Sequence, residues 1–472
     1  MIRKVVRPES AEGAEAPRVE ASKAIVLIVT TIASFSWPLM GSAINVALPA
    51  IERDFKVDAV LLSWVALSFT LATATLLVPM GRISDIYGRK RIFLGGTVVL
   101  TIASLLASVA TSIYMLIASR ILQGIGGAMS FGTSIAIVTS VYPPGERGKA
   151  MGINIAAVYL GISCGPLIGG FLTQQFGWRS IFVMNIPFGI LVVALGLLKL
   201  KGEWAEARGE RFDLGGSVIC SVALVALIVG LSMLPALTGW LAVALSLFGF
   251  FLFVKWELNS ESPVVNLAFF KNNRVFALSN VAALIHYSAT YAVTFMLSLY
   301  LQYVRGMSPQ SAGFLLIAQP IVQAVVTTWA GRLSDRIQPR LVASTGMAIT
   351  ALCLFMLSII DEQTSLSAIV AKLALLGFGF ALFSSPNTIA VMNSVETRSY
   401  GIASGILSTM RAVGQATSMA IAVLLIALYV GRVRINPEHF FFFLKSIRLT
   451  FLICGTLCVG GVFASIARGR TR

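Results

Sequence analysis

The sequence predicts an all-α integral membrane protein with about fourteen membrane-spanning helices. Of its 472 residues, 57% are hydrophobic and only 12% are charged, whereas soluble globular domains carry about 25% charged residues. The hydrophobic residues form runs of roughly 20, the length at which an α-helix crosses a bilayer. Composition therefore excludes a water-soluble domain, and the lipid bilayer becomes the expected surroundings.

The net charge of +16 is compatible in principle with nucleic-acid binding, but the positions of the charges argue against it. Most Lys and Arg residues fall in short loops on one side of the expected spans, which is the positive-inside pattern of membrane proteins. This bias predicts that both termini are cytoplasmic in a multi-pass protein of the plasma (cell) membrane.

The first 23 residues are polar and of mixed charge. No apolar core follows a short basic start, so they do not read as a cleaved signal peptide. We expect a disordered cytoplasmic tail over residues 1–23.

Hydrophobic runs separated by charged or Gly/Pro-rich breaks define the expected spans. They cover residues 24–49, 59–80, 92–110, 113–140, 150–173, 180–199, 214–234, 238–256, 275–303, 310–331, 341–360, 366–393, 400–430 and 443–467. One loop disagrees with the charge bias, because Arg432, Arg434, Lys445 and Arg448 are predicted on the outer side.

An internal repeat relates the two ends of the chain. The segment Gly81–Lys90 (GRISDIYGRK) recurs 250 residues later as Gly331–Arg340 (GRLSDRIQPR), each after the second span of a group of six. Such repeats are expected where two similar halves move about a central site. We therefore predict a six-helix half over 24–200, an inserted helix pair over 201–260 and a second six-helix half over 261–472.

These features resemble the major facilitator superfamily, and within it the fourteen-helix drug/proton antiporter group. The resemblance covers nearly the whole chain and implies alternating access by two halves related by pseudo-symmetry. Its strongest element is the segment Gly81–Lys90, which is similar to the family's loop between helices 2 and 3. There the resemblance implies a conformational switch in which Asp85 caps a helix or pairs across the halves and Arg89 joins the charge network. The predicted switch residues are Gly81, Asp85, Gly88, Arg89, Arg120, Asp335 and Arg336; a plain positive anchor is the alternative.

Arg120 lies in the segment SRILQGIGG (119–127). An arginine inside a span is costly unless it faces a cavity or a partner. It matches the family's helix 4 motif, whose arginine is implicated in proton transfer, and Gln123 lies one turn away. An arginine reaching the outer surface is the alternative.

The fifth span carries Gly161, Gly165, Pro166, Gly169 and Gly170. This pattern resembles the antiporter motif of exporters, and small residues at such spacing let helices pack closely. Uptake members usually lack it, so it favours export; generic helix packing is the alternative.

The sequence departs from the drug-exporter pattern at Met40, where an aspartate is usual. No acidic residue is placed securely at mid-membrane, and Glu257, Asp54 and Asp58 at span ends or in the first outer loop are the nearest candidates. His286 is the single histidine expected within the membrane, and its ordinary pKa suits a proton switch. A buried neutral histidine bonded to a hydroxyl is the alternative.

By resemblance, the first and fourth helices of each half line a substrate cavity with their neighbours. The predicted cavity residues are Asn45, Trp64, Arg120, Gln123, Asn280, His286, Tyr291, Gln319, Gln323 and Asn387. For any single amide, a bond between helices is an equal alternative. Such a lining favours amphipathic ligands, neutral or anionic ones as much as cations.

The leading functional prediction is secondary active export of small amphipathic compounds, drug-like or metabolite, with the proton as the coupling ion and a monomer as the working unit. A facilitator or symporter of a small metabolite is the alternative, which the missing aspartate favours. The sequence holds no G-x-x-x-x-G-K-[ST] loop for ATP. Two histidines and five cysteines without metal-type spacing predict no metal, no cofactor and no enzyme activity.

Overall fold

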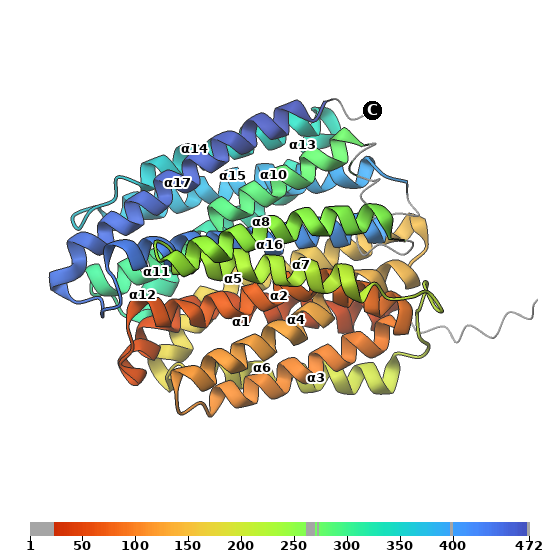
Figure 1. The fold of residues 1–472 in the computed structure, drawn as a ribbon, viewed down its shortest axis with the longest axis horizontal. Helices are drawn as coiled ribbons and strands as arrows, with labels where there is room; N and C mark the ends of the chain where they lie inside the picture. The colour runs from red at the N-terminus through yellow and green to blue at the C-terminus, as the bar shows by residue number, and fades with distance from the viewer. Residues whose placement is uncertain (1–22, 261–269, 271–272, 397–399, 470–472) are drawn as a thin grey trace, which may run out of the picture.

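A computed structural model describes residues 23–260, 270, 273–396 and 400–469 of the chain. The predicted tail over residues 1–23 lies outside the described residues except for Lys23. Within the described part every regular element is a helix, and fourteen of the spans are long and apolar enough to cross a membrane. The predicted fold class is confirmed: two six-helix halves with an inserted pair (Figure 1).

Six helices build the first half, and polar side chains cap several of them. They are α1 (Lys23–Phe55), α2 (Ala59–Tyr87), α3 (Arg89–Ser108), α4 (Ile113–Val141), α5 (Pro144–Phe176) and α6 (Ser180–Lys199). Asp58 accepts a hydrogen bond from the Leu61 backbone N–H at 2.9 Å, and Ser112 accepts one from Met115 N–H at 3.2 Å. These caps satisfy backbone donors that the first turn of a helix leaves free.

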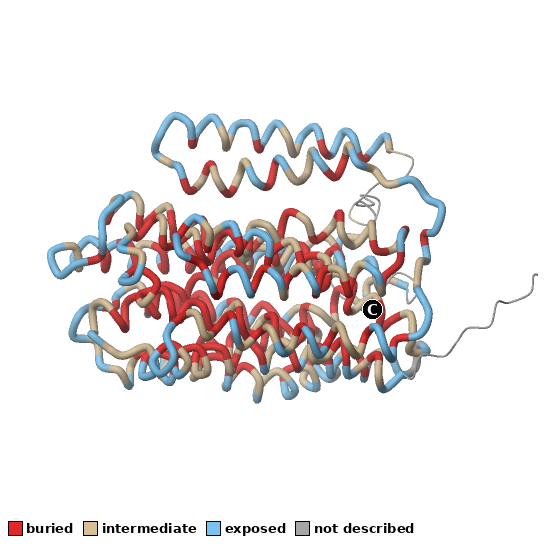
Figure 2. Tube along the Cα trace, turned by 90° about the horizontal axis from the view of Figure 1, so that it is seen from below, coloured by how far each residue is buried: buried red, intermediate tan, exposed pale blue. Residues whose placement is uncertain are grey.

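The inserted pair consists of α7 (Leu214–Met233) and α8 (Leu237–Asn259). Asp213 caps α7 through Gly216 N–H at 2.8 Å and also accepts from the Trp256 indole N–H at 3.0 Å. The same carboxylate therefore ties the start of α7 to the end of α8. Figure 2 shows this pair as an outer layer with much exposed surface, as expected for helices that face lipid.

The second half repeats the arrangement with several interruptions. Its elements are α10 (Arg274–Thr290), α11 (Ala292–Leu299), the short π-helix η1 (Tyr300–Val304), α12 (Pro309–Leu316), α13 (Ala318–Arg336), α14 (Pro339–Leu357), α15 (Leu366–Asn393), α16 (Tyr400–Tyr429), the 3₁₀ turn η3 (Pro437–His439) and α17 (Phe440–Ala467). The first three form one span, and α12 with α13 forms the next.

Two expected boundaries were wrong. Lys445 and Arg448 lie inside α17, which begins at Phe440, so the discordant loop is shorter and less basic than predicted. Arg448 donates to the Ile360 carbonyl at 2.7 Å, and the Lys445 ammonium lies 5.2 Å from the Tyr429 ring centre. Asp54 belongs to the last turn of α1 rather than to a loop.

The halves meet mainly where α2 contacts α16, where α5 contacts α12 and α13, and where α1 contacts α11; α4 also touches α16, and α1 touches α12. We call the end of the bundle that carries segments 81–90 and 331–340 the motif side, and the other end, which carries Phe55 and Pro309, the opposite side. In Figure 1 the helices run between these two ends along the long axis of the picture.

Candidate functional site

A cavity of about 770 Å³ lies between α5 of the first half and α13, α15 and α16 of the second. Arg147 and Asn393 line it at the motif side, since Arg147 lies in the first turn of α5 and Asn393 ends α15. Tyr159 and Ser384 line its deep end, where the Tyr159 hydroxyl and Ser384 Oγ are 2.5 Å apart. Arg147 and Tyr159 are about 18 Å apart along a helix that rises 1.5 Å per residue. The cavity thus runs from the motif side to about the middle of the bundle.

Polar contacts between the halves close the opposite side. Ser298 Oγ donates to the Asn45 carbonyl at 2.8 Å, and Gln302 Nε2 donates to the Val46 carbonyl at 2.9 Å. The Tyr303 hydroxyl donates to the Glu52 carboxylate. All three bonds join α11 or η1 to α1, so breaking them is a condition for separating the halves at this end.

Glycines allow the halves to touch closely at the same end. A Cβ on Gly313 of α12 would lie 2.1 Å from the Pro166 carbonyl oxygen of α5, and a Cβ on Gly170 would lie 2.5 Å from the Pro309 carbonyl oxygen. Real Cβ atoms do not approach so closely, so only glycine fits without moving backbone.

The other glycines of α5 pack against the first half's own helix α1. A Cβ on Gly161 would lie 2.3 Å from the Phe35 carbonyl oxygen, and one on Gly165 would lie 2.5 Å from the Ser42 side chain. Gly169 would meet Ala43 at 2.7 Å. The predicted antiporter glycines therefore serve two interfaces, one within the half and one between the halves.

Arg120 is buried in α4, with 1% of its surface exposed. Its Nε donates to the Val65 carbonyl at 2.9 Å, its Nη1 donates to Gln123 Oε1 at 2.8 Å, and its guanidinium carbon lies 4.5 Å from the Phe69 ring centre. The guanidinium thus points inward to partners, which excludes the alternative of an arginine that reaches the outer surface.

Met40 lies where the resemblance implies an aspartate, and its surroundings are polar. Gln123 Nε2 lies 3.5 Å from the Met40 sulfur and donates to Ser104 Oγ at 3.0 Å. Asn185 Nδ2 donates to the same Ser104 oxygen at 3.0 Å. The amide donors around Met40 therefore have the Ser104 hydroxyl and the Met40 thioether as acceptors. Arg120 joins this network through its bond to Gln123.

His286 of α10 is fully buried among aromatic rings. Its ring centre lies 4.1 Å from that of Phe383 and 4.8 Å from that of Phe380. Within the described residues neither ring nitrogen has a hydrogen-bond partner. The histidine is therefore buried, as the alternative held, but it is not bonded to a hydroxyl; its ring meets Phe383 in a tilted contact and Phe380 edge-on.

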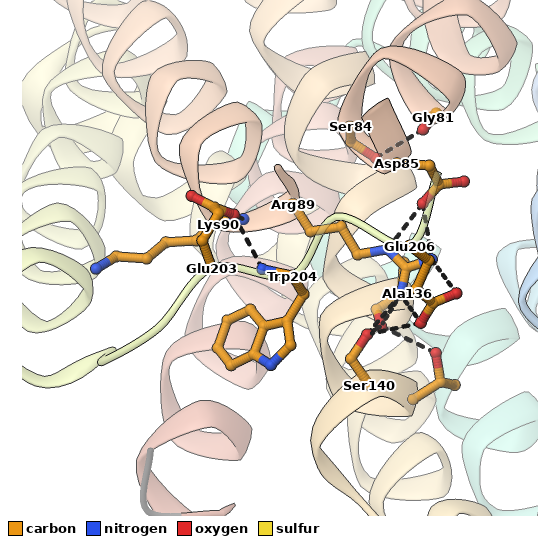
Figure 3. Close-up of polar contacts among 11 residues, drawn as sticks. Gly81, Ser84, Asp85, Arg89, Lys90, Ala136, Ser140, Glu203, Trp204 and Glu206 are labelled. Carbon is orange, nitrogen blue, oxygen red and sulfur yellow. Dashed lines mark hydrogen bonds and ion pairs between the residues drawn. The ribbon is translucent and has the colours of Figure 1, made fainter. Parts of the chain in front are cut away.

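Arg89 organises the motif side of the first half (Figure 3). Its guanidinium bonds Asp85 at 2.7 Å and bonds Glu206 through two nitrogens at 2.7 and 3.0 Å. Its Nη1 also donates to Ser140 of α4. Glu206 belongs to the linker 200–213 between α6 and α7, which sequence reasoning had not connected to the motif.

The linker touches the motif at further points. Glu203 Oε1 accepts from the Lys90 backbone N–H at 2.8 Å, and Glu210 pairs with Arg82 at 2.5 Å. Gly88 has φ of 118°, a left-handed conformation that favours glycine, and a Cβ there would lie 2.5 Å from the Glu203 side chain. In this conformation the charges of the motif are therefore satisfied within the first half and the linker, rather than across the halves.

Within the described part, none of the ten predicted cavity residues lines the 770 Å³ cavity. Asn280 donates to the Phe276 carbonyl at 2.9 Å. Asn387 donates to the Ser279 carbonyl at 3.1 Å and accepts from Arg468 at 2.8 Å. The remaining members Asn45, Trp64, Tyr291, Gln319 and Gln323 are buried or half-buried elsewhere in the bundle. Their role as cavity residues stays a prediction.

The second copy of the motif is only partly described. Arg336 ends α13 with an exposed side chain, and Gly331 lines the cavity. The side chain of Asp335 lies outside the described residues, so its predicted role in the switch is not tested.

Sequence reasoning missed most of the residues that line the cavity, although Asn393 was expected on the substrate path and Gly331 belongs to the repeated motif. Tyr159, Ser384 and Thr388 carry no motif, and Arg411 of α16 matches the family pattern without having been expected in the cavity. Glu52, with 5% of its surface exposed, was also missed, because its burial depends on Tyr303 from the other half.

Three comparisons place this architecture. The model of the Major Facilitator Superfamily matches residues 27–270 and 279–471. The riboflavin transporter RibZ of Clostridioides difficile is 30% identical over 82% of this chain and 85% of its own length. The multidrug resistance protein Stp of Mycobacterium tuberculosis is 34% identical over 84% of this chain and 74% of its own length.

A solved structure agrees with the fold. The bacterial homologue of the human lysosomal transporter Spinster, in an inward-facing and unoccupied conformation, superposes with a TM-score of 0.65 at 17% identity, over 94% of this chain and 96% of that one. With the repeat, the fourteen spans and a cavity between two halves, these matches show that the chain belongs to the Major Facilitator Superfamily and is a multi-pass membrane transporter of small molecules.

Proposed function

We propose that this protein is a secondary active exporter that moves small amphipathic compounds by alternating access, with protons as the coupling ion. The observation that carries the proposal is the cavity of about 770 Å³ between the halves, which reaches the motif side while three bonds from α11 and η1 close the opposite side. A site open to one side and closed to the other is what alternating access requires.

In the proposed orientation the motif side faces the cytoplasm of a cell-membrane protein, with both termini on that side. The basic loops support this orientation through the positive-inside rule. A cavity that faces the cytoplasm is where an exporter collects its substrate. The division into residues 24–200, 201–260 and 261–472 and a monomeric working unit belong to the same proposal.

The direction of transport rests on α5. Gly161 and Gly165 allow α5 to pack on α1, while Gly170 and Gly313 allow it to touch α12. A tightly fitted interface that seals the opposite side limits leakage of protons or substrate during export. The name of the multidrug resistance relative is consistent with this direction.

Proton coupling is proposed for the buried polar groups of each half. Arg120 with Gln123 in the first half and His286 in the second are buried, and Arg89 with Asp85 is the proposed switch. Met40 supports the second candidate function, a facilitator or symporter of a small metabolite, because no carboxylate stands at that place. The name of the riboflavin transporter relative fits that candidate.

Flux measurements in proteoliposomes under an imposed pH gradient test the proposal. Neutral, anionic and cationic compounds are compared in the wild type and in Arg120→Ala and His286→Ala. We expect the gradient to drive flux of at least one class and both variants to weaken the coupling. If the flux of no compound depends on the pH gradient, the antiporter proposal is rejected and the facilitator remains. If coupling is unchanged in both variants, Arg120 and His286 have no role in the coupling.

A further inference from the structure

The cavity between the halves has a one-sided charge. Arg147 at its mouth and Arg411 on α16 are its two charged lining residues, and among the described residues that line it there is no carboxylate. The ion pairs of the described part involve neither arginine. Among the described residues, no carboxylate therefore pairs with the positive charge of the cavity.

Arg411 is held in place but not satisfied. One guanidinium nitrogen, Nη2, donates to Thr388 Oγ1 at 2.6 Å, and the guanidinium carbon lies 5.6 Å from the Tyr287 ring centre. Its Nε is buried and has no partner among the described residues. A buried donor without a partner is costly, more so on a charged group. An anion that accepts from the guanidinium would remove this cost.

The position of Arg411 is fixed by its helix. It lies three turns into α16 from Tyr400, at 3.6 residues per turn, so it stands well inside the span rather than at its end. An arginine at such depth usually marks a substrate or ion pathway. Arg147, by contrast, lies in the first turn of α5 and donates its Nε to the Tyr142 carbonyl at 2.8 Å.

Apart from Arg147 and Tyr159, the residues of α5 that line the cavity form an apolar wall, whereas α15 on the other wall carries hydroxyls. Met151, Ile155 and Leu160 of α5 provide the apolar wall. Ser384 and Thr388 of α15 provide hydroxyls near Arg411. A ligand that fits both walls has an apolar body and a compact hydrogen-bond acceptor at one end.

We propose that the cavity binds small amphipathic anions, with a carboxylate or sulfonate held by Arg411 and hydroxyls of α15 and the apolar body packed against α5. This assignment deepens the proposed export function and rests on it for its biological meaning. Arg147 at the mouth attracts the anion and is the weaker contributor, because it lies where water screens its charge.

Equilibrium binding in phosphatidylcholine nanodiscs tests the assignment with three probes of one shape. They are 2-naphthoate, the neutral 2-naphthamide and the cationic 2-naphthamidine. We expect the wild type to bind naphthoate at least tenfold tighter than the amidine. Arg411→Gln should weaken naphthoate binding at least tenfold and change amide binding less than threefold. The naphthoate affinity of Arg411→Lys should lie between those of the wild type and Arg411→Gln, since lysine keeps the charge and loses the planar guanidinium.

The control is Lys445→Gln, which removes one positive charge from an exposed residue of α17 outside the cavity. We expect it to bind all three probes as the wild type does, and amide binding reports that each variant is folded. The proposal is overturned if the wild type does not bind naphthoate, if it prefers the amidine, or if Arg411→Gln weakens naphthoate and amide equally. Loss of naphthoate binding when a tenth of the lipid is phosphatidylglycerol would assign the cavity to lipid head groups and overturn it as well.

Binding and flux separate the two proposals. Binding that does not depend on Arg411, together with flux driven by the pH gradient, would reject the anion site and keep the exporter. Anion binding that depends on Arg411, without flux of any compound, would keep the site and reject transport by this protein.

Discussion

The two ends of the bundle satisfy their polar groups in different ways. On the opposite side, Ser298, Gln302 and Tyr303 of the second half bond to α1 of the first. On the motif side, Arg89 pairs with Asp85 of its own half and with Glu206 of the linker. One end is therefore sealed by bonds between the halves, whereas at the other end the charge of Arg89 is neutralised locally.

This difference has an energetic meaning. Opening the opposite side must break bonds between the halves, and each buried hydrogen bond contributes roughly 1 kcal/mol. At the motif side Arg89 and Asp85 stay paired while the cavity is open, so the open state leaves the Arg89 guanidinium with its partners. Substitutions at the opposite side should thus change the populations of the open and closed conformations. Substitutions at Arg89 and its partners on the motif side should instead change the free energy of unfolding.

Removal of Arg89 should have the largest effect. Its side chain is 6% exposed and bonds Asp85 and Glu206, so Arg89→Ala leaves the half-buried Asp85 without its partner. Breaking a buried pair costs about 3–5 kcal/mol, and we expect the low end, because Asp85 is 30% exposed. Denaturant unfolding of the purified protein measures the change. The control is Arg91→Ala, whose side chain is 78% exposed; equal losses in the two variants would contradict the central place of Arg89.

Gly313→Val should disturb the sealed end next. A Cβ at this position would lie 2.1 Å from the Pro166 carbonyl oxygen, and overpacking of this kind costs about 1–3 kcal/mol. Because the contact exists only when this end is closed, we expect the open population to rise about fivefold or more and flux to fall. Gly460→Val is the control, since a Cβ at Gly460 has no heavy atom within 4 Å. Wild-type flux in Gly313→Val would show that the contact does not limit closure.

Tyr303→Phe should also raise the population in which the opposite side is open, but by less than Gly313→Val does. It removes the hydroxyl that bonds Glu52 across the halves, so the closed end loses about 1 kcal/mol. We expect a severalfold rise in thiol labelling of a cysteine placed at Val46, a buried residue of α1 whose backbone carbonyl still accepts from Gln302, in an otherwise cysteine-free protein. Tyr114→Phe, at a tyrosine that is 71% exposed, should leave labelling unchanged. A Tyr303→Phe protein that labels as slowly as this control would argue against the bond as part of the seal.

Glu206→Gln should change the free energy of unfolding the least of these substitutions. Its side chain is 66% exposed, and ion pairs with an exposed partner contribute up to about 1 kcal/mol. We expect the free energy of unfolding to fall by less than that amount, and to fall less still at high salt, because salt screens the ion pair. A loss as large as that of Arg89→Ala would mean that the linker, rather than Asp85, is the main partner of Arg89.

Much of the fold could be predicted from the sequence, because a span is a local property of length and hydrophobicity. Lys445 and Arg448 were counted with the outer loop because they look like loop residues until the Ile360 carbonyl and the Tyr429 ring are known to lie beside them. The bond between Arg120 and Gln123 was within reach of sequence reasoning, since residues three apart share a helix face.

The site itself was less accessible to sequence reasoning. Tyr159 and Ser384 belong to different halves and lie 225 residues apart, and the sequence does not specify which conformation of the two halves is populated. Glu206 joins Arg89 from more than a hundred residues away, through a linker whose acidic residues read as ordinary solvated charges. Contacts of this kind depend on tertiary placement, not on local pattern.

Distance measurements between spin labels report whether the two halves alternate between two open states. One pair, at Lys56 and Gln363, spans the halves at the opposite side, and a second pair, at Lys149 and Arg336, spans them at the motif side. We predict two populations whose distances change in opposite directions, so that a long motif-side distance accompanies a short opposite-side distance. Gly313→Val should raise the population with a short motif-side distance and a long opposite-side distance. A single population, with both distances unchanged by pH, by substrate and by that substitution, would contradict it.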